Sequence, residues 1–157
     1  MKTLARSNPR RSYRIRSVTF RVVREPGAPD PRELSTPSAV ARLARDVIPD
    51  DGREHFVVFL LNASLRVLGV HEVSVGTADA SLVSPRDVFG AALRVLGTVA
   101  IILCHSHPSG DPTPSKADVR LTRELVEAGK LLDLPVHDHV IVSHEGTYVS
   151  LAEHGDM

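Results

Sequence analysis

A short apolar run, TVAIILC, occupies residues 98–104 and is rich in β-branched side chains. This length and composition are typical of a central strand that is buried on both faces of a sheet. A β-hairpin is predicted from strands at 54–62 and 65–75, which are separated by the turn sequence Asn-Ala-Ser. Two more strands are predicted at 136–143 and 147–150, joined by a Glu-Gly turn. The chain is therefore expected to build a sheet around residues 98–104.

Three helices are predicted between these strands from capping signals at their N-termini. A serine or threonine side chain accepts a hydrogen bond from the first free amides of a helix, and proline is tolerated in the first turn. Such signals, followed by apolar residues at helical spacing, predict helices over residues 36–48, 84–97 and 115–132. Together with the strands, they predict a mixed α/β (α+β) domain.

The composition indicates a single soluble globular domain. The 157 residues are 42% hydrophobic and 24% charged, the usual balance of such a protein. Cys104 is the only cysteine, so no disulfide can form within the chain, and a reducing, cytoplasmic location is expected. No apolar run is long enough to span a bilayer, and the N-terminus lacks the apolar stretch of a signal peptide. No membrane partner is expected.

The N-terminal segment is strongly basic. Residues 1–24 contain eight lysines and arginines and no acid, which leaves 11 bases against 19 acids in the remainder. Residues 1–12 are predicted to be a disordered basic tail, and residues 13–23 alternate apolar with basic or polar side chains, as an edge strand would. The arginine-rich arm is suited to a nucleic-acid backbone or an acidic partner. Alternatively, the arm docks on its own acidic domain or is only solvated.

Potential metal ligands follow the central strand directly. His105 and His107 are two residues apart, so their side chains are expected on the same face. A segment rich in proline and glycine then leads to Asp118, in the first turn of the next predicted helix, where the helix dipole favours a carboxylate. Two histidines and one aspartate would leave the fourth tetrahedral position of Zn²⁺ open for water, the arrangement of a catalytic site. A water on zinc ionises near pH ~7 instead of ~15.7.

The pattern His105-Ser106-His107, seven residues, Ser115, two residues, Asp118 resembles the JAMM motif of MPN+ domains. An upstream glutamate completes that motif, and Glu54 stands where the pattern places it. The resemblance implies a zinc metallopeptidase or isopeptidase that acts on a peptide or protein. It also implies that Glu54 takes the proton of the zinc-bound water and that the Ser115 hydroxyl stabilises the tetrahedral intermediate.

The RadC-like branch of this family matches more closely. The segments VSVGTADASLVSPRDVF, HPSGDPTPSKADVRLT and DHVIV are similar to its signatures, and the resemblance assigns residues 13–157 to a RadC-like JAB/MPN domain. It implies a cytidine-deaminase-like fold with a central mixed sheet flanked by helices. RadC-like proteins usually carry an N-terminal helix-hairpin-helix region, which is not expected within these 157 residues. They also commonly read HNHPSG where this chain reads HSHPSG, a difference that leaves the ligands untouched.

Several residues have other interpretations. Ser115 and Asp118 could form only a helix capping box, and Glu72 is an alternative to Glu54. A second His-x-His pair, His137 and His139, is expected on one strand face, with a core role or a role in orienting a metal ligand. Cys104 is expected to be a buried apolar side chain, because its neighbour His105 faces the other way and cannot serve it as a base. Ser109 is read as part of a turn.

The leading hypothesis from the sequence is therefore a zinc-dependent amide hydrolase. A second hypothesis is a DNA-associated protein that binds nucleic acid through the basic arm, since RadC-like proteins traditionally carry a DNA-repair label. A third is a scaffold that uses the MPN fold without catalysis. The sequence does not indicate an oligomeric state.

Overall fold

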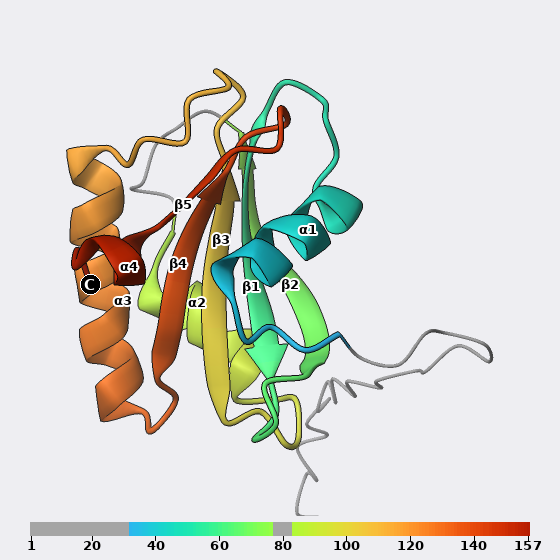
Figure 1. The fold of residues 1–157 in the computed structure, drawn as a ribbon. Helices are drawn as coiled ribbons and strands as arrows, with labels where there is room; N and C mark the ends of the chain where they lie inside the picture. Colours follow the sequence, from blue (N-terminus) through green and yellow to red (C-terminus); the bar gives the residue numbers. More distant parts are fainter. Residues whose placement is uncertain (1–31, 77–82) are drawn as a thin grey trace, which may run out of the picture.

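The computed structural model describes residues 32–76 and 83–157. The basic tail predicted at 1–12, the strand predicted at 13–23 and the arginine-rich arm lie outside the described residues. Within them, the chain forms a sheet with helices on both sides, as Figure 1 shows. The mixed α/β prediction is confirmed.

The sheet has five strands in the order β2-β1-β3-β4-β5. Neighbouring strands run antiparallel except for β3 and β4, which are parallel. The predicted hairpin is present as β1 and β2, and the predicted central strand is β3, all seven residues of which are buried. The strands are β1 Glu54–Leu61, β2 Val67–Gly76, β3 Ala100–Ser106, β4 Val136–Val142 and β5 Tyr148–Ser150.

The three predicted helices begin where their caps were expected. The side chains of Thr36, Ser84 and Ser115 each accept a hydrogen bond from a backbone amide of the following turn. The second helix ends at Ala92, earlier than the predicted end near Gly97, and a short C-terminal helix was not predicted. The helices are α1 Pro37–Val47, α2 Pro85–Ala92, α3 Lys116–Leu131 and α4 Leu151–His154.

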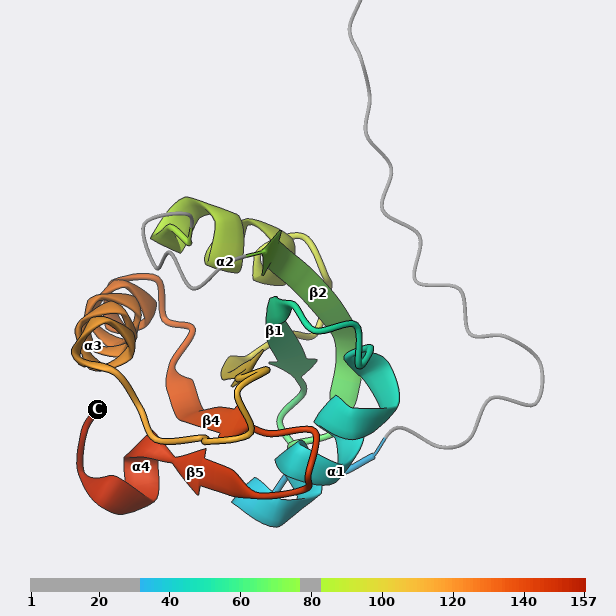
Figure 2. The same ribbon diagram turned by 90° about the horizontal axis from the view of Figure 1, so that it is seen from above.

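The two faces of the sheet are covered by different helices. Helix α1 packs on one face, where Val57, Phe59 and Cys104 join its apolar side. Helices α2 and α3 cover the other face, over Phe56, Val58 and neighbouring side chains, and Figure 2 shows the two layers from above. Among the described residues, none of the helices has both the length and the apolar character needed to cross a bilayer.

The topology gathers three chain segments at one end of the sheet. Strand β3 runs toward this end, antiparallel β1 begins there, and α3 starts there after the loop that follows β3 (Figure 1). The predicted site residues lie in these segments. Strand order brings Glu54 to this end from a distant part of the sequence, whereas the other site residues lie in the consecutive elements β3 and α3 and in the loop between them.

Candidate metal centre

His105 and His107 lie on the same face at the end of β3. Their Nε2 atoms are 2.9 Å apart. The His105 ring is 1% exposed, whereas the side chain of His107 is 16% exposed at the rim of a cavity. The imidazoles therefore converge on one point, as their spacing predicted.

Asp118 reaches the same point from the first turn of α3. Its carboxylate oxygens lie 3.6 Å from His105 Nε2 and 3.8 Å from His107 Nε2. One of these oxygens also accepts a hydrogen bond from the Ser115 backbone N–H at 2.7 Å, and the Asp118 N–H donates to Ser115 Oγ at 3.1 Å. The capping box foreseen in the sequence is therefore present, and it holds the carboxylate beside the imidazoles.

The donor set fits a metal ion such as zinc. His107 Nδ1 lies 2.8 Å from the carbonyl oxygen of Asp111. A carbonyl only accepts, so Nδ1 of His107 carries the proton and Nε2 keeps its lone pair. Two atoms that each bind zinc at ~2.0–2.1 Å are at most about 4.2 Å apart. The Nε2 atoms of the two histidines are within this limit at 2.9 Å, and each lies within it of one Asp118 carboxylate oxygen, Oδ1 at 3.6 Å from His105 and Oδ2 at 3.8 Å from His107. All three groups offer ligand atoms within 4.8 Å of one another.

Buried side chains surround His105 on its inner side. Its Nδ1 lies 2.8 Å from His139 Nε2, and the ring of Phe56 stacks on it with centroids 5.9 Å apart. Burial lowers the pKa of His105 to about 4, although the carboxylate of Asp118 opposes the shift. Burial also lowers the pKa of His139 well below its ordinary value, and the nearby imidazoles add to this. Both rings are therefore neutral at pH 7, the form in which imidazole binds a metal.

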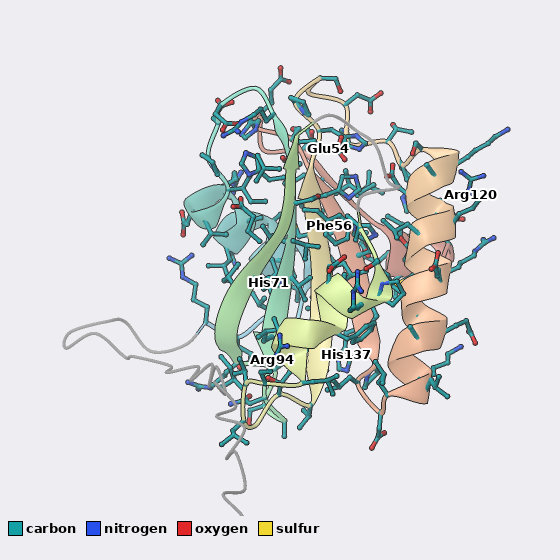
Figure 3. All side chains as sticks on the ribbon, turned by 180° about the vertical axis from the view of Figure 1, so that it is seen from behind. Glu54, Phe56, His71, Arg94, Arg120 and His137 are labelled. Atoms are coloured by element: carbon teal, nitrogen blue, oxygen red, sulfur yellow. The ribbon has the colours of Figure 1, made fainter. Side chains whose placement is uncertain are left out.

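The second histidine pair is split by an irregularity in β4. Ile101 of β3 pairs with Val136 and Ile102 pairs with Asp138, so His137 has no partner in the ladder. The extra residue in β4 reverses the order in which its side chains alternate between the two faces of the sheet. His139 is buried against His105, whereas His137 is exposed and lines a different pocket beside α1. The expectation that both histidines share a face is therefore wrong. Figure 3 shows His137 toward the other end of the sheet from Glu54.

Glu54 lies on the same side of β1 as the histidines. Phe56 pairs with His105 in the antiparallel ladder. Glu54 lies two residues before Phe56, so its side chain is on the same face of the sheet and level with His107. Behind it, the His55 N–H donates to Ser106 Oγ at 3.0 Å, so Ser106 points away from the imidazoles as expected. Glu54 and Phe56 are labelled in Figure 3. Burial raises the pKa of Glu54, with His107 opposing and Asp118 adding to the shift.

A cavity of about 520 Å³ joins these groups. Glu54, His107, Ser115 and Asp118 all line it, whereas the alternative base Glu72 does not and bonds instead to His55. Its volume is within the range of ~300–1,000 Å³ that small-molecule sites occupy. The structure therefore brings together every residue that the JAMM-like pattern selects.

The other two nucleophile candidates, Cys104 and Ser109, have structural roles. Cys104 is fully buried among apolar side chains on the α1 face, and burial raises the pKa of its thiol. Ser109 lies in the turn after His107, where its Oγ accepts a hydrogen bond from the Asp111 N–H at 3.4 Å. Ser109 also lines the cavity, but its hydroxyl oxygen is engaged by the turn.

The sheet, its helical layers and this converging donor set define the class of the protein as a JAB-type domain with a candidate metal site. The family model for the RadC-like JAB domain matches residues 34–156. The chain therefore belongs to the RadC-like JAB domain family, and the resemblance found in its motifs is confirmed.

Curated relatives support the same assignment. A UPF0758 protein of Caldanaerobacter subterraneus is 42% identical over 122 residues, which are 78% of this chain and 52% of the relative. A UPF0758 protein of Rubrobacter xylanophilus is 45% identical over 134 residues, 85% of this chain and 56% of the relative. A UPF0758 protein of Moorella thermoacetica is 46% identical over 120 residues, which are 76% of this chain and 52% of the relative. The chain thus spans about half the length of the curated relatives it matches.

Proposed function

We propose that this chain is a zinc-dependent hydrolase that cleaves an amide bond in a peptide or protein. The supporting observation is that His105, His107 and Asp118 converge within 4.8 Å beside a cavity that Glu54 and Ser115 also line. Two imidazole nitrogens and one carboxylate suit zinc, and three protein ligands are the number found in catalytic zinc sites. When bound, zinc would polarise the substrate carbonyl and lower the pKa of water.

Glu54 is the proposed general base. It lies at the start of β1, half-buried and facing the cavity, so it can accept a proton from an attacking water and later return it to the leaving amine. The partly buried position that raises its pKa makes it a stronger base than a solvated carboxylate. The charged groups that influence the pKa of Glu54 among the described residues are His107 and Asp118, both at the candidate site.

Ser115 is the proposed donor to the developing oxyanion. Its Oγ accepts the Asp118 N–H, and its own hydroxyl hydrogen donates to no group among the described residues. The hydrogen can therefore point into the cavity, which Ser115 lines. A donor held in place by a helix cap needs little reorganisation when negative charge forms on the substrate oxygen.

The experiment measures zinc and hydrolysis separately. Purified full-length protein is analysed for bound zinc and then incubated in H₂¹⁸O with a mixture of unfolded peptides, whose new C-termini are read by mass spectrometry. We expect one zinc per chain and ¹⁸O at the new carboxylates. Glu54→Gln should keep its zinc and lose about 10²–10⁴-fold in rate.

Glu124→Gln is the matched control, because Glu124 is exposed on α3 and does not line the cavity. It should hydrolyse peptides at the wild-type rate. Equal hydrolysis by Glu54→Gln, or undiminished hydrolysis after zinc is removed with a chelator, would refute the proposed mechanism.

A further inference from the structure

The side chain of Thr122 lies in α3 behind the candidate metal centre and contacts two groups. Its Oγ1 is 2.7 Å from the carbonyl oxygen of Asp118 and 2.6 Å from Nδ1 of His139. Thr122 and His139 are both 0% exposed, so solvent does not compete for these contacts. The hydroxyl has one hydrogen, and a carbonyl oxygen can only accept. Thr122 therefore donates its hydrogen to Asp118.

This assignment fixes the proton of His139. Because the only hydrogen of Thr122 is used, the contact at 2.6 Å requires His139 Nδ1 to be the donor. Among the described residues, the hydrogen-bond partners of the His139 ring are Thr122 and His105, and the Asp138 carboxylate accepts only the backbone N–H of His139. A charged imidazolium in this buried position would be costly. The ring therefore carries one proton, and its Nε2 is an acceptor.

The contact between His139 and His105 then determines which ring nitrogen of His105 carries the proton. His139 Nε2 lies 2.8 Å from His105 Nδ1, so His105 must donate from Nδ1. Its Nε2, which faces His107 and Asp118, is then left with a lone pair. His107 reaches the same protonation state by a separate contact, through the carbonyl of Asp111.

We propose that Thr122 and His139 are positioning residues that keep the proton of His105 on Nδ1 and its Nε2 lone pair directed at the cation. The inference rests on the proposed metal site but does not depend on peptide hydrolysis. The hydrogen bonds connect α3, β4 and β3, so they tie the helix that carries Asp118 to the strand that carries His105.

The first test compares two substitutions that separate the shape of the side chain from its hydroxyl group. Thr122→Val keeps the branched shape but removes the hydroxyl, whereas Thr122→Ser keeps the hydroxyl. The zinc dissociation constant of each full-length variant is measured by competition with a chromophoric chelator. We expect Thr122→Val to bind about 10–100-fold more weakly and Thr122→Ser to stay near the wild-type value. Equal affinity of wild type and Thr122→Val, or equal loss in both variants, would overturn the inference.

The second test reads the proton directly and requires no substitution. Long-range ¹H–¹⁵N NMR of the zinc-loaded, histidine-labelled protein reports which ring nitrogen carries hydrogen. We expect His139 to be protonated on Nδ1 alone in wild type and in Thr122→Ser, with a changed pattern in Thr122→Val. A wild-type His139 protonated on Nε2 would contradict the chain of hydrogen bonds even if Thr122→Val does not fold.

The two proposals fail in different ways. A wild-type chain that binds no zinc overturns both of them. A chain that binds zinc but hydrolyses no peptide leaves the positioning role standing, because neither readout involves a substrate. Tight zinc binding that is unchanged in Thr122→Val rejects the positioning role alone.

Discussion

Ser115 and Asp118 hold each other through two reciprocal hydrogen bonds: the Ser115 N–H donates to the Asp118 carboxylate at 2.7 Å, and the Asp118 N–H donates to Ser115 Oγ at 3.1 Å. The same carboxylate lies within 3.8 Å of both imidazoles. One side chain therefore begins a helix and faces a candidate metal position. The two roles can be separated because they need different chemistry.

Asp118→Asn should separate them. An amide oxygen still accepts the Ser115 N–H, so the metal-free variant should be close to the wild type in its free energy of unfolding. A neutral amide is a weaker ligand than a carboxylate, and we expect zinc affinity to fall by at least about 100-fold. Asp118→Ala should additionally lose up to about 1 kcal/mol of stability, because the Ser115 N–H loses its partner in the capping box. Chelator competition and urea unfolding of the metal-free proteins measure the two effects, and wild-type zinc affinity in Asp118→Asn would contradict the ligand assignment.

Gly129→Ala tests the packing of α3 against its surroundings. A Cβ at this position would lie 2.6 Å from the Leu134 carbonyl oxygen and 3.2 Å from the Phe89 ring. The backbone contact cannot relax cheaply, and overpacking of about 1–3 kcal/mol should exceed the gain of about 1 kcal/mol in helix propensity. We expect a net loss of stability in urea unfolding.

Gly90→Ala in α2 is the control for this change. The nearest atom to its Cβ would belong to the side chain of Arg94, at 3.6 Å. The substitution should therefore be neutral or stabilising by up to about 1 kcal/mol. If both alanine variants behave alike, close packing at Gly129 is not the cause.

Stability should depend on pH through His55. The ring is 2% exposed and lies 2.8 Å from Glu72 and 3.0 Å from Asp51. Burial lowers the pKa of His55, but the hydrogen bonds to Glu72 and Asp51 more than offset this and the net shift is upward. A raised pKa in the folded state means that His55 stabilises the fold fully below its unfolded pKa of ~6.5 and loses this effect as pH rises through the folded value.

Glu72→Gln should show this dependence. Its destabilisation relative to wild type should be larger at about pH 6 than at about pH 9, because the charged pair is present only at the lower pH. Urea unfolding in the presence of a chelator excludes a contribution from zinc release. Glu124→Gln should show no such difference, and a pH-independent effect of Glu72→Gln would count against the raised pKa.

Cys104 should be chemically inert in the folded protein. It is fully buried, and its raised pKa leaves almost no thiolate. A thiol reagent should label it at least about 100-fold more slowly in buffer than in urea. Rapid labelling with loss of hydrolysis would instead support a cysteine nucleophile.

The local signals in the sequence predicted most of the fold. Caps at Thr36, Ser84 and Ser115 marked the starts of three helices, because a hydroxyl beside a free amide is a local interaction. Helix α4 also had a signal, since Ser150 caps it through the Glu153 amide and Gly155 ends it in the left-handed conformation. That pattern is short and follows a strand directly, so strand propensity obscured it.

Features that depend on pairing between strands were not predictable in the same way. The irregularity at His137 is decided by how β4 meets β3, and no property of the histidine itself indicates it. The contact of Thr122 with His139 joins residues 17 positions apart on a helix and a strand. The JAMM-like spacing predicted which residues would converge, whereas the side chains that hold them appeared only in the folded arrangement.

His105, His107 and Asp118 all come from one strand–loop–helix segment, whereas Glu54 enters the cavity from the neighbouring strand β1. The proposed capture of an ion and the proposed activation of water are thus assigned to separate parts of the chain. Under the proposed mechanism, one substitution at Glu54 would silence the chemistry of such a domain during evolution and leave its ligands and its shape intact. Inactive descendants of this architecture would then differ from active ones at the first residue of β1 rather than among the ligands.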